Sequence, residues 1–244
     1  EIENLNENSQ IIFCARARSL LRPYADFLKQ DNLIWLEKSQ GMDDRGKFKS
    51  SFPSNCQEVI ESWNTLQEGY SIKGTDYIKM VKQIDIKFIS ERKKTALSKK
   101  DTAPVELYEA DKMFSYEELK NKFYLNAPLE KMWHEIFYFD TTRIQSATKP
   151  KAIFRDREDF NDYLKGCWEK NKNLTTEITL STIHGVKGME AEKVVLAVEW
   201  GFSLKAYKMG NQKDEDDELR VCYVGVTRAK KELYLFEPPG QYKN

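Results

Sequence analysis

The sequence predicts an α/β fold in which a sheet is interrupted along the chain by a mostly helical insertion. Short apolar runs typical of strands occur near both ends of the 244 residues, whereas apolar residues at helical spacing fill the middle. Because a sheet buries its apolar faces under helices, we expect residues 1–38 and 177–244 to form one domain and residues 39–176 to form the insertion.

The first 38 residues predict a strand, a helix and a second strand. Residues 11–14 are an apolar run, apolar residues between 20 and 28 recur at helical spacing, and 33–36 form a second short run. Pro23 lies inside the helical pattern, and proline is tolerated in the first helical turn, so we expect the helix to begin near it. This order is typical of the start of a βαβ unit.

The middle of the chain predicts helices connected by loops. The aromatic residues there favour a buried core over a cage for a ligand, and they include Trp133, Phe137, Tyr138 and Trp168. The expected helices are 56–70, 74–94, 115–125, 128–139 and 156–170.

Strand patterns return from residue 177 onward. Residues 177–183, 193–200 and 232–236 predict strands, and a helix is expected at about 215–229. This helix contains several β-branched residues, and Gly225 costs about 1 kcal/mol relative to alanine. A segment that breaks local rules in this way is often constrained by packing or by a site.

Composition excludes several classes of protein. No run approaches ~18 consecutive apolar residues, and no secretory leader opens the chain, so we expect a soluble intracellular protein, cytoplasmic and without a membrane partner. The 39 basic residues balance 39 acidic ones, and only local patches could indicate a polyanionic partner. For the basic stretch 91–100, a solvated face is favoured over contact with duplex phosphates.

The four cysteines show no paired spacing. Cys14, Cys56, Cys167 and Cys222 lie far apart beside apolar residues, so we expect small buried side chains, not a disulfide framework or a metal site.

Two stretches carry a specific resemblance. STIHGVKGMEAEKVVL (181–196) resembles motif V of UvrD-like superfamily 1 helicases, and DELRVCYVGVTRAKKELYL (217–235) resembles their motif VI, in the same order. IIFCARARSLLRPYADFL (11–28) is similar to motif IVa, although Ala15 stands where the family usually has an arginine. SWNTLQEGYSIKGTDYIKMV (62–81) is similar to a helical stretch of compact, often viral, members.

The resemblance implies the second, C-terminal RecA-like motor domain of such a DNA helicase. The implied fold is a RecA-like parallel sheet of the P-loop NTPase type without the P-loop, since no G-x-x-x-x-G-K-[ST] stretch is found in the sequence. ATP and Mg²⁺ would be held mainly by the N-terminal RecA-like domain, which the sequence lacks. This fragment alone is therefore expected to be inactive.

Roles follow for matching residues. Arg228 would be the arginine finger on the γ-phosphate, and Glu190 would reach the ribose of ATP. Thr182 and His184 would contact the backbone of single-stranded DNA, with support from Lys187. A sixth residue, Arg220, would brace motif VI or approach the phosphates.

Chemistry is consistent with these roles, but simpler explanations exist for each residue. A planar guanidinium that keeps its proton suits the charge that develops on a transferred phosphoryl group. Without the resemblance, His184 would be a packing or surface residue, Lys187 a solvated lysine and Arg228 a cation at a helix end. A non-catalytic RecA-like module for nucleic-acid or protein interaction is the alternative function. Such a module has no need of Arg228 or Glu190.

Overall fold

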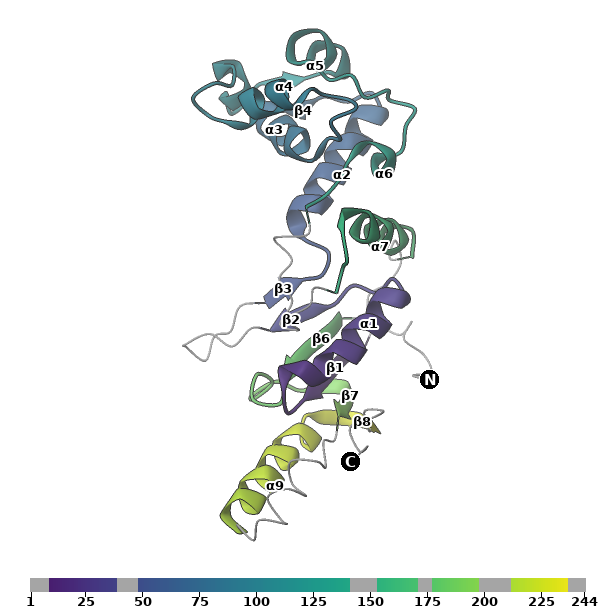
Figure 1. The fold of residues 1–244 in the computed structure, drawn as a ribbon, viewed down its shortest axis with the longest axis vertical. Helices are drawn as coiled ribbons and strands as arrows, with labels where there is room; N and C mark the ends of the chain where they lie inside the picture. The colour runs from purple at the N-terminus through teal and green to yellow at the C-terminus, as the bar shows by residue number, and fades with distance from the viewer. Residues whose placement is uncertain (1–8, 39–47, 141–152, 171–176, 198–211, 237–244) are drawn as a thin grey trace. The chain divides into compact units, whose positions relative to one another are not determined.

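The computed structural model describes residues 9–38, 48–140, 153–170, 177–197 and 212–236 (Figure 1). Contacts within the chain define two compact units. The first contains the large sheet, and the second comprises Phe52–Arg143 and Phe154–Lys165. The predicted domain boundaries at residues 39 and 176 fall outside the described residues, so they stay predictions.

Among the described residues, the first unit is built on a six-stranded sheet with the strand order β3-β2-β6-β1-β7-β8. The neighbours from β2 to β8 pair in parallel, and β3 is added antiparallel at one edge. This mostly parallel sheet confirms the predicted α/β class. The strands are β1 (Gln10–Ala15), β2 (Leu36–Lys38), β3 (Phe48–Ser50), β6 (Glu177–Thr182), β7 (Ala191–Ala197) and β8 (Ala229–Phe236).

Successive side chains of β1 point to opposite faces of the sheet, and a helix packs on each face. On one face, Phe13 contacts Tyr24 of helix α1 (Arg22–Gln30), with 5.2 Å between ring centroids. On the other face, Ile12 and Cys14 belong to a buried cluster against which α9 (Gln212–Val226) packs. A 3₁₀ turn, η1 (Arg18–Leu21), precedes α1, and Pro23 lies in the first turn of α1, as predicted.

Gly225 allows α9 to approach the sheet closely. A Cβ atom at this position would lie 3.1 Å from Cδ1 of Leu196 and 3.6 Å from Cγ1 of Ile183. Close packing therefore accounts for the glycine inside this helix. β8 is the last strand of the described sheet, and its Leu233 and Leu235 are exposed.

The second unit is mostly helical and contains a small antiparallel ladder. Its ladder joins β4 (Ile72–Lys73) to β5 (Met113–Phe114). Its helices are α2 (Ser54–Gln67), α3 (Gly74–Gln83), α4 (Glu91–Ser98), η2 (Val105–Tyr108), α5 (Tyr116–Phe123), α6 (Trp133–Ile136) and the first part of α7 (Arg157–Lys170).

Two of the predicted helices are shorter than expected. The helix expected at 74–94 ends at Gln83, because Ile84 turns extended and forms an isolated bridge with Phe137. The same bridge follows α6 directly and limits the helix expected at 128–139 to four residues.

Aromatic side chains form the core of the second unit. Trp63 is fully buried, packs edge-to-face on Phe137 with 5.9 Å between centroids, and donates from Nε1 to the Lys131 carbonyl oxygen at 3.0 Å. These aromatic residues therefore form a core that supports the fold.

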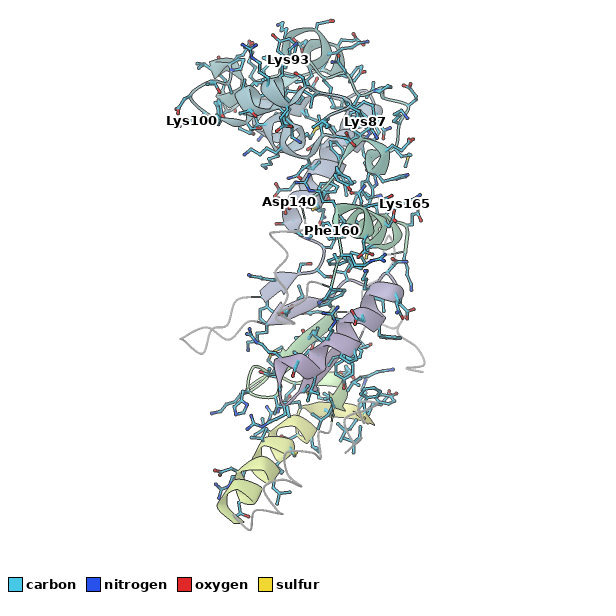
Figure 2. All side chains as sticks on the ribbon, viewed as in Figure 1. Lys87, Lys93, Lys100, Asp140, Phe160 and Lys165 are labelled. Carbon is cyan, nitrogen blue, oxygen red and sulfur yellow. The ribbon has the colours of Figure 1, made fainter. Side chains whose placement is uncertain are left out.

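The basic stretch 91–100 lies in the same unit, and its Lys93 and Lys100, labelled in Figure 2, are exposed.

Candidate functional site

The residues that the sequence singles out lie at two opposite edges of the sheet. Ala15 pairs with both Thr182 and Ala197, so β6, β1 and β7 end at the same carboxyl edge. The first residues of β7 and β8, Ala191 and Ala229, pair with each other at the amino edge. Since a strand advances about 3.3 Å per residue, the length of β7 separates the two edges by about 20 Å.

Residues 183–190 connect one edge to the other. Ile183 and Val186 are buried in the cluster beneath α9, which anchors the connection to the sheet. Backbone hydrogen bonds tighten it, from Val186 N to Thr182 O at 3.2 Å and from Met189 N to Val186 O at 2.9 Å. The connection is therefore a packed part of the unit.

At the carboxyl edge, Thr182 and His184 come together. Thr182 is 8% exposed, and its Oγ1 accepts a hydrogen bond from Gly185 N at 3.2 Å, which leaves the hydroxyl hydrogen able to donate. His184 is exposed, and so is Lys187 farther along the connection. A Cβ at position 185 would overlap the buried Oγ of Ser181, so a larger residue there would force the Ser181 side chain to move.

At the amino edge, Glu190 and Arg228 flank the paired starts of β7 and β8. The Ala191 N–H donates to the Arg228 carbonyl oxygen at 3.0 Å, which joins the two segments directly. The exposed Glu190 carboxylate lies 3.5 Å from Nζ of Lys230, a residue that sequence reasoning missed. No sequence signal marks Lys230, whose partner depends on strand pairing.

Three acceptors hold the Arg228 side chain. Nε donates to the Val224 carbonyl oxygen at 2.9 Å, Nη1 to the Met189 carbonyl oxygen at 3.2 Å, and Nη2 to Oγ1 of Thr227 at 3.0 Å. A guanidinium has five N–H groups. One N–H on each terminal nitrogen therefore has no acceptor among the described residues, and such a pair can bind two oxygens of one phosphate.

Arg220 lies apart from Arg228. It is exposed on α9, and its Nη1 lies 3.0 Å from Oδ1 of Asp217. Arg220 lies six residues before Val226, the last residue of α9, which corresponds to about 9 Å along the helix, and Arg228 lies beyond that end. The structure does not bring Arg220 together with the other residues of the amino edge.

Comparison with known proteins identifies the family. The model of the UvrD-like helicase C-terminal domain matches residues 22–237. The chain belongs to this family. Its mostly parallel sheet is thus the RecA-like fold that the resemblance implied.

Relatives of this UvrD-like domain are named as helicases. The chain is 25% identical over 228 residues, 88% of its length, to the putative ATP-dependent DNA helicase YjcD of Bacillus subtilis, and covers 29% of that protein. It is 33% identical over 93 residues, 34% of its length, to DNA helicase II of Rickettsia typhi, and covers 14% of it. With PcrA, an ATP-dependent DNA helicase of Bacillus subtilis, it shares 41% over 59 residues, 24% of the chain and 8% of PcrA. The chain thus spans less than a third of each of these relatives.

The four cysteines of the chain are free thiols. Burial raises the pKa of Cys14 and of Cys56 to about 12, so both stay neutral. Within the described ranges, no group of three or more His, Cys, Asp or Glu side chains could hold a metal ion. None of the described helices is long and apolar enough to cross a membrane.

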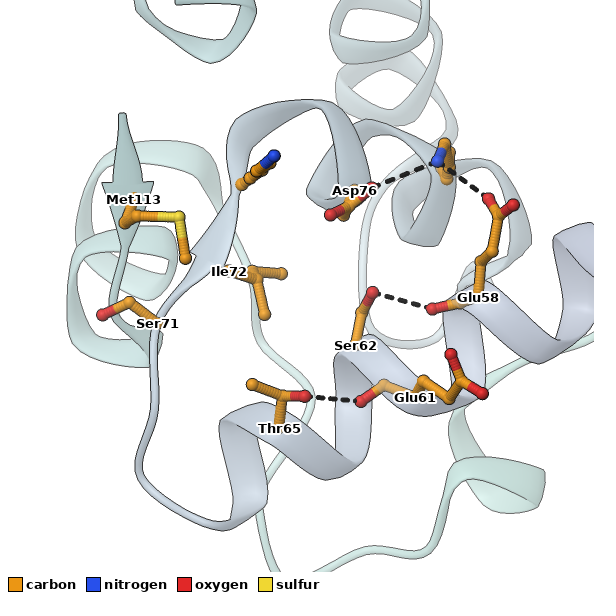
Figure 3. A pocket seen from close by; sticks show the side chains of 10 residues that line it. Glu58, Glu61, Ser62, Thr65, Ser71, Ile72, Asp76 and Met113 are labelled. Carbon is orange, nitrogen blue, oxygen red and sulfur yellow. Dashed lines mark hydrogen bonds and ion pairs between the residues drawn. The ribbon is translucent and has the colours of Figure 1, made fainter. Parts of the chain in front are cut away.

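A groove of about 400 Å³ lies in the second unit, beside α2, β4 and α3 (Figure 3). Lys79 Nζ lies 2.8 Å from Glu58 and 3.1 Å from Asp76, and these hydrogen bonds, the one to Glu58 first, raise its pKa. The Ser62 hydroxyl donates to the Glu58 carbonyl oxygen at 2.7 Å. Because these groups satisfy one another, we assign the groove no ligand.

Proposed function

We propose that the chain is the C-terminal motor half of an ATP-dependent DNA helicase that translocates along single-stranded DNA. The observation that carries the proposal is the connection 183–190, which begins beside Thr182 at one edge of the sheet and ends beside Arg228 at the other. A segment so placed contacts DNA with one end and ATP with the other.

The amino edge is the ATP side. The two N–H groups that Arg228 has left bind γ-phosphate oxygens and stabilise the charge that develops on them during hydrolysis. Glu190 accepts a hydrogen bond from the ribose, and its exposed carboxylate beside Lys230 fits this role. Arg220 lies within α9, eight residues before Arg228, and supports motif VI or approaches the phosphates.

Most of the nucleotide site belongs to the N-terminal RecA-like domain, the partner of this chain in the full-length enzyme. That domain supplies the phosphate loop and holds ATP with Mg²⁺, which neutralises phosphate charge. Without it, Arg228 has no bound nucleotide to act on, so the chain alone does not hydrolyse ATP. We place the full-length enzyme in the cytoplasm, where free thiols such as Cys14 persist.

The carboxyl edge is the DNA side. The Thr182 hydroxyl and the His184 imidazole donate to phosphate oxygens of a single strand without reading bases, and Lys187 adds a positive charge nearby. Because His184 and Lys187 are exposed, they reach a strand without local unfolding. DNA bound here shifts the connection and thereby the position of Glu190.

Substitution of Arg228 in the full-length protein tests the proposal. Arg228→Ala should lower the rate of DNA-stimulated ATP hydrolysis by about 10³-fold or more, with single-strand affinity nearly unchanged. Arg228→Lys should fail too, because an ammonium lacks the planar fork. The matched control is Arg155→Ala, which removes an arginine that is 84% exposed in the second unit. Near-normal turnover of the lysine variant would overturn the finger assignment.

A further inference from the structure

Thr227 holds the Arg228 side chain through its hydroxyl group. Its Oγ1 accepts from Arg228 Nη2 at 3.0 Å, and its own hydrogen is directed to the Tyr223 carbonyl oxygen at 2.9 Å, with Val224 O at 3.2 Å. A hydroxyl with its hydrogen fixed in this way presents its lone pairs in a defined direction. The bond to Tyr223 thus orients the oxygen that receives the guanidinium.

The other two acceptors of Arg228 are main-chain carbonyl oxygens, those of Val224 and Met189. Each lies in a different segment, one in the last turn of α9 and one at the end of the connection 183–190. Of the three acceptors, the Thr227 hydroxyl is the one that belongs to a side chain. A substitution can therefore remove this acceptor and leave the backbone in place.

We propose that Thr227 is a positioning residue for the arginine finger, which fixes the Arg228 guanidinium so that its two remaining N–H groups meet the γ-phosphate together. This inference rests on the proposed function of Arg228. An arginine side chain loses rotamer freedom when it is ordered. A site that orders it before the transition state forms avoids that cost during hydrolysis.

Threonine itself had one signal in the sequence. Thr227 is one of the β-branched residues in the segment predicted to be helical, and such residues have a lowered helix propensity. It stands directly before Arg228. The hydrogen bond to Nη2 supplies a reason for a β-branched hydroxyl residue at this position.

The experiment uses the full-length protein with two substitutions of Thr227 and one control substitution elsewhere. Thr227→Val keeps the shape of the side chain and removes the hydroxyl, whereas Thr227→Ser keeps the hydroxyl. The control is Thr65→Val, because the Thr65 hydroxyl donates to the Glu61 carbonyl oxygen four residues earlier at 2.8 Å, like that of Thr227, but binds no arginine. DNA-stimulated kcat, KM for ATP and melting temperature are measured for each.

Thr227→Val should lower kcat about tenfold, as expected for one lost hydrogen bond to a charged group, with KM for ATP within about twofold. Thr227→Ser should stay within about threefold of the parent, and Thr65→Val should match the melting shift of Thr227→Val without loss of kcat. In the Arg228→Ala background, Thr227→Val should cost nothing further, because its effect passes through the arginine.

The outcomes separate this inference from the function on which it rests. If Arg228→Ala is inactive but Thr227→Val has normal kcat, or if serine fails as badly as valine, Thr227 does not position the finger. If Arg228→Ala retains turnover, the assignment of the finger itself is wrong.

Discussion

Gly69 and Gly188 adopt similar backbone conformations in the two units, with φ of +86° and +79°, and a Cβ on either would meet no atom within 4 Å. The two turns differ in what they do for the chain. Gly69 follows α2, and hydrogen bonds from Gly69 N to Leu66 O and from Tyr70 N to Thr65 O close a Schellman motif. The first glycine is thus explained by the end of a helix.

Gly188 ends no regular helix. It lies in the connection 183–190, and the residues around it include the exposed His184, Lys187 and Glu190. Glu68 and Tyr70 beside Gly69 are exposed as well, but the helix that this glycine ends, α2, buries Trp63 and Leu66. The difference teaches that one backbone conformation ends a helix at Gly69 and turns the connection between two edges of the sheet at Gly188.

Trp63→Ala gives the largest effect and tests the structural side of this comparison. Loss of a fully buried indole should lower the free energy of unfolding by about 3–5 kcal/mol. Chemical denaturation followed by fluorescence and circular dichroism measures this loss. In molecules that remain folded, the ratio of DNA-stimulated to basal ATPase should not change. A loss under 1 kcal/mol would contradict the role of Trp63 in the core.

His184→Ala tests the other side of the comparison. Removal of one hydrogen bond to phosphate should weaken single-strand binding by about 1–2 kcal/mol. Stimulated ATPase should fall far more than basal ATPase, because the contact exists only with DNA bound. Both rates are measured at saturating DNA, together with the melting temperature. A packing role would instead lower the melting temperature and reduce both rates equally.

Gly188→Ala and Gly69→Ala form a matched pair with the smallest effect. Each alanine must adopt a positive φ, at a cost of about 1 kcal/mol in the free energy of unfolding. Only Gly188→Ala should also reduce DNA stimulation of the full-length enzyme. Equal stimulation in both variants would mean that the connection 183–190 does not couple DNA to ATP.

Sequence reasoning found the elements that local pattern determines. The apolar runs at 11–14 and 177–183 are strands, and Pro23 marks the start of α1, since proline fixes the backbone locally. The end of α3 at Gln83 depends on the bridge from Ile84 to a residue far along the chain, which no local pattern contains. The two-residue strands β4 and β5 are too short to give a periodic signal.

For the candidate site, the motifs predicted which residues take part but not how these residues are arranged. Thr182 and Arg228 lie at opposite ends of the parallel strands, about the length of β7 apart. This separation depends on how the strands pair, which the sequence does not state. The contacts of Thr227 with Arg228 and of Lys230 with Glu190 depend on side-chain conformation and strand pairing. Both contacts are therefore visible only in the folded chain.

The position of β8 at the end of the described sheet has a practical consequence for work with the separated domain. A strand at an open edge offers backbone N–H and C=O groups to a second chain, and exposed leucines such as Leu235 favour that contact. The lysines at positions 230 and 231 discourage it near the start of the strand only. As far as the described residues cover this edge, we therefore expect concentrated stocks of the domain to associate strand to strand.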